Sequence, residues 1–162
     1  MSVRVFTTGG TIDKVYFDAK SSFQVGEPQI GELLAEAGVS SPYSVTPLLR
    51  KDSLELDEDD RALIADEVAA AAERRVLITH GTDTMVETAR ALLGIPDKTV
   101  VLVGAMQPAR LRVSDAFFNI GFAFAAAQLL PPGVYVAMHG RIFDPRRTHK
   151  NVAAQRFESD AD

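Results

Sequence analysis

The chain has 162 residues, of which 46% are hydrophobic and 24% charged. This composition excludes a disordered protein, and the length suits a single domain. The net charge of −5 provides no basic stripe for a nucleic-acid backbone, and the absence of cysteine excludes disulfides, thiol catalysis and cysteine-held metals. No apolar run is long enough to span a bilayer and no leader peptide is visible, so we expect a cytoplasmic protein with neither membrane nor nucleic-acid partners.

Strands and helices alternate along the chain. Apolar runs bounded by small polar residues predict strands, and apolar residues at three- and four-residue spacing predict helices. We expect strands over residues 2–8, 44–49, 75–80, 99–103 and 134–138, and helices over residues 29–37, 57–72, 85–93 and 113–124. This alternation predicts a single α/β domain over residues 1–162, with a doubly wound, mostly parallel sheet and helices on both faces, in a Rossmann- or flavodoxin-like arrangement.

Residues 13–26 follow the first strand and show no clear period. They carry the aromatic residues Tyr16, Phe17 and Phe23. Long segments without regular structure are often functional, so this stretch is interpreted either as a mobile lid over a site or as a surface loop whose aromatic side chains pack into the core.

The predicted helix over residues 113–124 is apolar on two sides. Phenylalanine and isoleucine recur along it at helical spacing, at Phe117, Phe118, Ile120, Phe122 and Phe124. A helix of this kind is either deeply buried or part of a subunit interface. In a domain this small we expect an interface, and hence a homo-oligomer.

Two strand ends carry residue types suited to catalysis. The sequences TTGGT (residues 7–11) and THGTDT (residues 79–84) each place a threonine after a glycine, at the carboxyl end of an apolar strand. This edge of an open α/β sheet is where ligands bind. We therefore expect the two turns to face one pocket, with Thr11 and Thr82 as the candidate nucleophiles.

A threonine hydroxyl is a weak nucleophile and needs a base and an oxyanion site. The candidate bases are Lys150, Tyr16 and Asp83, and the backbone N–H groups of the glycine turns are candidate oxyanion donors. The three histidines are too scattered to suggest a zinc site, and we expect His80 to be structural.

The two turns resemble the signature motifs of bacterial-type L-asparaginases. TTGGTI (residues 7–12) and THGTDTMVET (residues 79–88) stand in the family's order, and VGAMQP (residues 103–108), Ser114-Asp115 and Asn119 resemble further family segments. The resemblance covers nearly the whole chain. It implies a cofactor-free and metal-free amidohydrolase that converts L-asparagine to L-aspartate and ammonia through an acyl-enzyme.

The resemblance also implies a role for each residue. Thr11 attacks the side-chain amide carbon, and Tyr16 relays protons. Thr82, Asp83 and Lys150 form a second set of hydroxyl, acid and base, in which Asp83 also binds the substrate's α-ammonium group. The expected substrate-binding set is Gly10, Asp52, Ser53, Gly81, Thr82, Asp83, Ala105 and Met106.

The chain departs from the family pattern in three respects. Family members usually carry a second domain that helps to close a neighbouring subunit's site, and we expect that domain to be absent here and substrate affinity to be weaker. The family's lid tyrosine usually lies shortly before a Val-Gly pair, whereas Val25-Gly26 follows Phe23, so Tyr16 is the remaining candidate. Leu54 follows Ser53, the residue expected to bind the α-carboxylate, where the family often has a polar group.

Two other functions remain open from the sequence. One is a non-catalytic module that senses asparagine or aspartate, and the other is a hydrolase of a different amide or ester. The joint presence of Thr11, Thr82, Asp83 and Lys150 argues against the binding module, because a binder does not need the full set. The residue types alone do not decide whether Thr11 or Thr82 attacks the substrate.

Overall fold

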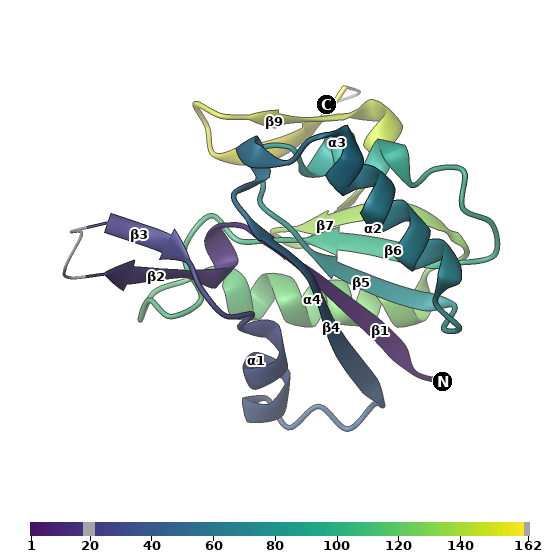
Figure 1. Ribbon diagram of the computed structural model, residues 1–162, viewed down its shortest axis with the longest axis horizontal. Helices are drawn as coiled ribbons and strands as arrows, with labels where there is room; N and C mark the ends of the chain where they lie inside the picture. The colour runs from purple at the N-terminus through teal and green to yellow at the C-terminus, as the bar shows by residue number, and fades with distance from the viewer. Residues whose placement is uncertain (18–21, 161–162) are drawn as a thin grey trace.

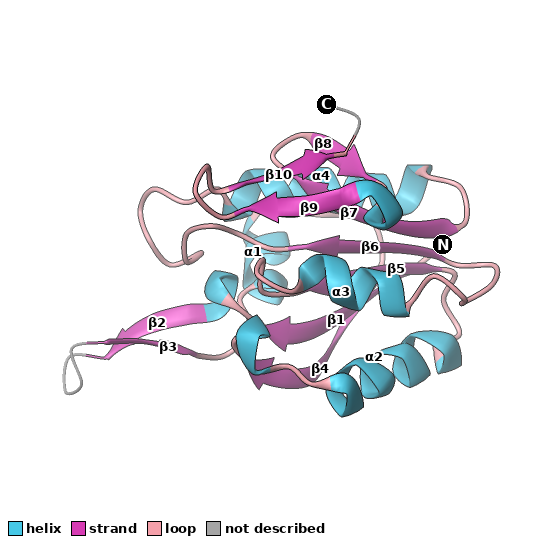
Figure 2. Ribbon diagram, turned by 90° about the horizontal axis from the view of Figure 1, so that it is seen from above, coloured by secondary structure: helices cyan, strands magenta, loops and turns pink. Residues whose placement is uncertain are grey.

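The computed structural model describes residues 1–17 and 22–160. Its main sheet has the strand order β4-β1-β5-β6-β7-β8, with helices α2 and α3 on one face and α1 and α4 on the other (Figures 1 and 2). The strands of this sheet are β1 (Val3–Gly9), β4 (Tyr43–Lys51), β5 (Arg75–Thr79), β6 (Thr99–Val103), β7 (Gly133–Met138) and β8 (Arg141–Phe143). The helices are α1 (Ile30–Glu36), α2 (Glu58–Ala70), α3 (Met85–Ala91) and α4 (Ala116–Leu129). The predicted α/β fold is confirmed.

The order of the strands locates the ligand edge of the sheet. The pairings among β4, β1, β5, β6 and β7 are parallel, and β8 pairs antiparallel with β7. Counted in chain order, the parallel strands run 2-1-3-4-5, the flavodoxin-like arrangement. In such sheets ligands bind at the carboxyl ends of the two strands where the order reverses, here β1 and β5. These are the strands that end in the two glycine turns.

The core lies on both sides of the central strands. β6 is buried along its whole length, and β5 is buried from Val76 onwards. Strands covered on both faces read as continuous apolar runs, which is why the sequence predicted them well. The run of acidic residues at the start of α2 has a structural role: Asp57 accepts from the Asp60 N–H, and the Asp60 side chain accepts from the Asp57 N–H, forming a capping box. None of the helices in the described part of the chain has the length and apolar character that a membrane crossing needs.

The prediction for residues 13–26 needs correction, because this stretch forms an antiparallel hairpin. β2 (Lys14–Phe17) pairs with β3 (Ser22–Val25), and residues 18–21 lie outside the described residues. The hairpin projects from the body of the domain (Figures 1 and 2). Its three aromatic side chains are exposed, with 54% of Tyr16 accessible, so they do not pack into the core. Aromatic and β-branched residues favour strands even without strict alternation, and that signal was missed.

Two helix starts also differ from the predictions. From the sequence alone, Thr82 or Asp83 is expected to cap α3, because either side chain can accept from the first turn. The N-cap is Thr84, whose side chain makes no capping bond and whose N–H donates to Ser53 Oγ at 3.3 Å. Helix α4 begins at Ala116 and not at Val113, whose side chain is 82% exposed.

Two short elements complete the region beyond the sheet. β9 (Thr148–Asn151) and β10 (Arg156–Ser159) form an antiparallel pair. They follow a 3-10 turn, η4 (Pro145–Arg147). Arg90 in α3 fastens this region to the domain by donating to the carbonyls of Pro145 at 2.8 Å and Thr148 at 3.2 Å. Lys150 therefore sits on a strand that is anchored next to α3.

Candidate functional site

The structure brings the two glycine turns into direct contact. Gly10 has a φ of +87°, and a Cβ atom added to it would lie 2.4 Å from the Gly81 nitrogen and 2.5 Å from the Gly81 Cα. Cβ atoms do not approach backbone this closely without a shift of the chain. Glycine at position 10 is therefore required both by its backbone conformation and by the space available.

A third strand end joins the two turns. Lys51, the last residue of β4, accepts from the Gly10 N–H through its carbonyl at 2.9 Å. Ser53 opens the short 3-10 turn η3 (Ser53–Glu55) and is buried, and a Cβ atom on Gly81 would lie 2.7 Å from its Oγ. The Thr84 hydroxyl donates to the Ser53 carbonyl at 2.7 Å. Ser53 is thus held directly against the second glycine turn.

Asp52 lies between the end of β4 and the start of η3. Its carboxylate accepts from the Leu54 N–H at 3.1 Å and pairs with Lys14 at 3.1 Å. Partial burial raises the pKa of Asp52, but the Leu54 N–H and the Lys14 ammonium outweigh that effect, so the pKa is lowered overall. Asp52 therefore carries a negative charge at neutral pH, at the base of the hairpin.

Lys150 reaches two of the predicted site residues from β9. Its Nζ donates to Thr82 Oγ1 at 2.7 Å and to Asp83 Oδ1 at 2.6 Å. The lysine side chain is only 13% exposed, and Thr82 is buried. A lysine that contacts a hydroxyl and a carboxylate at once has the geometry of a proton-transfer set.

The segment after β6 forms another wall beside Thr82. The Thr82 hydroxyl lies 3.8 Å from Met106 Sδ. The Met106 N–H donates to Asp115 at 2.9 Å, and Asp115 also accepts from His139 Nε2 at 2.8 Å. Partial burial raises the pKa of Asp115, but these donors outweigh it and the pKa is lowered. Asn119 completes the support by donating to the Gly104 carbonyl at 3.0 Å, so the peptides of Ala105 and Met106 are held in a fixed position.

His80 supports the second glycine turn from inside the core. Its Nδ1 lies 2.6 Å from the Gly81 carbonyl oxygen, and its Nε2 lies 2.8 Å from Thr88 Oγ1. Because a carbonyl can only accept, Nδ1 carries the proton and Nε2 accepts from the Thr88 hydroxyl. Complete burial lowers the pKa of His80 to about 4, so the ring is neutral. Arg61 in α2 also donates to Thr88 Oγ1 at 3.3 Å, a contact that no motif in the sequence predicted.

Thr11 and Tyr16 are placed differently from the other candidates. Thr11 directly follows Gly10 and begins the 3-10 turn η1 (Thr11–Asp13); it is half-buried, and its hydroxyl has no hydrogen-bond partner among the described residues. Tyr16 lies on the hairpin, with its ring edge-on to Phe23 at 5.5 Å between centroids. Its hydroxyl has no hydrogen-bond partner within the described ranges, so the structure does not join Tyr16 to the other site residues.

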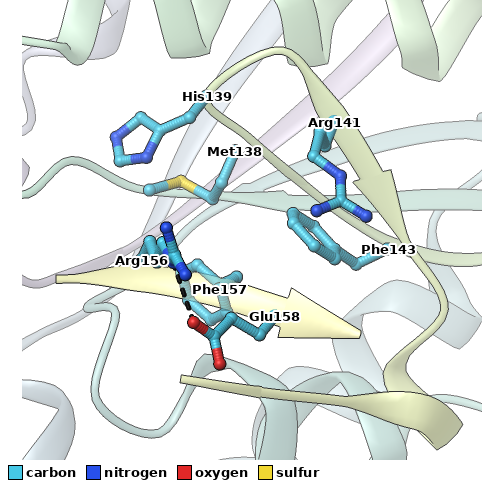
Figure 3. Close-up of a pocket in the computed structure, with 7 residues that line it drawn as sticks. All are labelled: Met138, His139, Arg141, Phe143, Arg156, Phe157 and Glu158. Carbon is cyan, nitrogen blue, oxygen red and sulfur yellow. Dashed lines mark hydrogen bonds and ion pairs between the residues drawn. The ribbon is translucent and has the colours of Figure 1, made fainter. Parts of the chain in front are cut away.

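A separate hollow lies away from these residues. It has a volume of about 560 Å³ and is lined by Met138, His139, Arg141, Phe143, Arg156, Phe157 and Glu158 (Figure 3). The Arg141 guanidinium carbon lies 4.9 Å from the centre of the Phe143 ring, and Arg156 donates to Glu158 at 2.8 Å. The hollow contains none of the predicted site residues. A smaller hollow of about 200 Å³ lies between α3 and β9, and its lining includes Asp83 and Lys150.

The family of the chain follows from comparison with known proteins. The model of the family described as "Asparaginase, N-terminal" matches residues 2–160. The chain belongs to the asparaginase N-terminal family.

Relatives of the asparaginase N-terminal family resemble the chain along most of its length. It is 32% identical to an L-asparaginase of Thermococcus kodakarensis over 158 residues, which are 93% of this chain and 48% of that protein. The solved structure of the thermostable L-asparaginase from Thermococcus kodakarensis superimposes with a TM-score of 0.83 at 28% identity, covering 98% of this chain and 51% of the other. The chain thus spans about half the length of these asparaginases.

A second kind of relative matches a shorter region. The chain is 41% identical to part of a glutamyl-tRNA(Gln) amidotransferase of Methanococcus vannielii, over 99 residues of one of its component chains. Those residues are 59% of this chain and 23% of the relative. The asparaginase N-terminal fold is therefore also similar to part of an amidotransferase.

Proposed function

We propose that the chain hydrolyses the side-chain amide of L-asparagine to give L-aspartate and ammonia, with Thr11 as the nucleophile. The observation that carries this proposal is the contact of Lys150 with both Thr82 and Asp83, beside the joined glycine turns. A protein that only bound an amino acid would not need a largely covered lysine on a threonine hydroxyl. Membership of the asparaginase N-terminal family supports the same reaction.

The reaction proceeds in two steps. The Thr11 hydroxyl adds to the amide carbon, and its proton passes to the departing nitrogen. Ammonia then leaves, and the substrate remains bound as an ester of Thr11. Water then attacks the ester, returns a proton to the threonine oxygen and releases aspartate. The Gly10 N–H already donates to the Lys51 carbonyl, so the oxyanion is stabilised by other N–H groups of the two turns.

Thr82, Asp83 and Lys150 position the substrate and move protons in this proposal. The Asp83 carboxylate binds the α-ammonium group, and Ser53 binds the α-carboxylate from the opposite side of Gly81. Lys150 donates both of its observed bonds, so it must give up a proton before it can accept one from Thr82. Tyr16 reaches the site only if the hairpin moves towards it, which is the lid motion that the sequence suggested.

Self-association is part of the same proposal. Phe118 on α4 is 62% exposed and stacks against Phe122 with ring centroids 6.3 Å apart, which leaves an aromatic patch on the surface. We expect this patch to be covered in a homo-oligomer. Light scattering of the wild type and of Phe118→Glu tests it, with a lower mass for the variant as the expected result.

One experiment separates the candidate functions. The purified protein is incubated with asparagine, glutamine and aspartate, while released ammonia and heat of binding are measured. Ammonia from asparagine supports the proposal. Ammonia from glutamine alone would indicate a glutamine-directed amidohydrolase. Heat of binding without ammonia would indicate a binding module. Neither ammonia nor heat with any of the three compounds would indicate a hydrolase of another amide or ester.

A further inference from the structure

Asp13 ties the turn of the proposed nucleophile to two other segments. It is the last residue of η1, two positions after Thr11, and is only 2% exposed. Its N–H donates to the Gly10 carbonyl at 3.1 Å, and its carbonyl accepts from the Gly26 N–H at 2.8 Å. Since Gly26 directly follows β3, the backbone of Asp13 closes the base of the β2–β3 hairpin.

The carboxyl group of Asp13 adds a third connection. Its Oδ1 accepts from the N–H of Gln29, the residue before α1, at 2.9 Å. Gln29 is itself fixed, because its side chain donates to the Glu27 carbonyl at 2.8 Å and accepts from Arg110 Nε at 3.1 Å. The carboxyl group is therefore attached to a rigid point of the domain.

Thr11 lies in the same turn, between Gly10 and Ile12. Its hydroxyl has no partner of its own among the described residues, whereas Ile12 is fixed by its fully buried side chain and by its carbonyl, which accepts from the Ala109 N–H at 3.0 Å. We propose that Asp13 is a positioning residue for the hydrolysis: its buried carboxyl fastens the turn that carries Thr11, and with it the base of the hairpin, to the start of α1. This inference rests on the proposed function and deepens it.

The charge of Asp13 changes near neutral pH. Burial raises its pKa to about 7, against the opposing effects of the Gln29 N–H and the charge of Arg50. The charge that acts on it is that of Arg50 from β4, which pairs with Glu27 at 2.7 Å. Arg110, from the segment after β6, is bonded to Gln29. An ionised carboxylate accepts a hydrogen bond from an N–H more strongly than a neutral carboxyl does, but the cost of burying its charge outweighs that gain, which is why the pKa is raised. The turn is therefore held less firmly above pH 7 than below it.

The test measures kcat and KM for asparagine from about pH 5 to about pH 9 in the wild type, Asp13→Ala, Asp13→Asn and a control, Asp60→Asn. Asp60 is a comparable, largely buried carboxylate that caps α2 and pairs with Lys51. Asp13→Ala removes the anchor, so kcat falls by roughly 10-fold or more while KM changes by less than about 3-fold. Asp13→Asn keeps the acceptor but does not titrate, so its kcat lacks the fall that the wild type shows as the pH rises through 7. Asp60→Asn keeps that fall.

Each outcome decides the inference. A folded Asp13→Ala protein with the wild-type kcat would overturn it, as would an Asp13→Asn protein that retains the fall in kcat near pH 7. If Asp13→Ala does not fold, the pH profile of Asp13→Asn decides alone. A wild type that releases no ammonia contradicts the proposed function and this inference with it, whereas an active wild type with unaffected variants contradicts the inference only.

Discussion

Gly10 lies against Gly81 so closely that a Cβ atom on Gly10 would sit 2.4 Å from the Gly81 nitrogen. The ends of β1 and β5 are therefore in contact, and Ser53 also lies against Gly81, with its Oγ 2.7 Å from where a Cβ atom on Gly81 would be. The position of the two candidate threonines relative to each other is thus set by backbone packing, with little freedom to adjust.

Gly10→Ala should therefore unfold or distort the site. The added methyl group meets backbone atoms that cannot rotate away, and alanine is strained at a φ of +87°. We expect the free energy of unfolding to fall by at least about 2 kcal/mol and activity to be lost. Urea denaturation measures the first effect and ammonia release the second.

Gly121→Ala is the matched control for that variant. Gly121 lies inside α4, and an added Cβ would have nothing within 4 Å. Alanine favours a helix interior over glycine, so stability should rise by up to about 1 kcal/mol with kcat unchanged. Equal losses of stability in Gly10→Ala and Gly121→Ala would show that the contact between the turns is not decisive.

Lys150→Met should abolish turnover. The substitution keeps the length of the side chain but removes the group that contacts Thr82 and Asp83. We expect kcat to fall by roughly 10³-fold or more, because both proton transfer and the orientation of the Thr82 hydroxyl are lost. Lys98→Met is the control, since Lys98 donates to the carbonyls of Ala71 and Glu73. That variant should have a lower Tm and a near-normal kcat, and a normal kcat in Lys150→Met would refute the assigned role.

Tyr16→Phe tests the hairpin as the source of a proton relay. The variant keeps the edge-on contact with Phe23, so its Tm should equal that of the wild type. Its kcat should fall by orders of magnitude, because only the hydroxyl is missing. Phe23→Ala removes the ring contact and should mainly impair closure of the hairpin over the substrate. Near-normal turnover of Tyr16→Phe would remove Tyr16 from the mechanism.

The stability of the protein should depend on pH through Asp13. Its pKa rises from 3.8 to about 7 on folding, so between these values the unfolded chain is ionised while the folded chain keeps the proton. Stability contributed by the neutral group is complete below pH 4 and is lost as the pH rises towards 7. Asp13→Asn does not titrate, so its Tm relative to the wild type should increase from about pH 4.5 to about pH 7.5. A Tm difference that does not change with pH would show that the pKa of the Asp13 carboxyl group is not raised by burial.

The effect of His80 on the pH dependence of stability is opposite to that of Asp13. It does not affect the Tm difference between the wild type and Asp13→Asn. The pKa of His80 falls to about 4 on folding, so acidification below about pH 6.5 protonates the unfolded chain first and destabilises the fold. Both proteins contain His80, and its contribution cancels in the difference between their Tm values.

The fold followed from the sequence because its strands are covered on both faces. Val100 to Val103 form a continuous buried run, and such a run needs no partner to be recognised. The hairpin was missed because its strands are short, exposed and stabilised by pairing with each other. Its residues 14–17 carry no strict alternation that would mark a strand.

The candidate site was predictable to different degrees. Motifs and family resemblance pointed to Thr82, Asp83 and Lys150, and the structure brings them within hydrogen-bond distance. Asp13 was not predictable, because an aspartate is exposed in most proteins and only the folded chain shows it buried beneath the hairpin. The role of Arg61 was not predictable either, since its contact with Thr88 joins two helices that no motif links.

The central claim is that Thr11 attacks the amide of asparagine. The most direct measurement compares ammonia release from asparagine by the wild type and by Thr11→Val, with calorimetric binding of aspartate as a check on the pocket. We expect ammonia and aspartate in equal amounts from the wild type, and turnover reduced by several orders of magnitude in Thr11→Val with aspartate binding retained. Undiminished ammonia release by Thr11→Val would contradict the central claim and would transfer the role of nucleophile to Thr82.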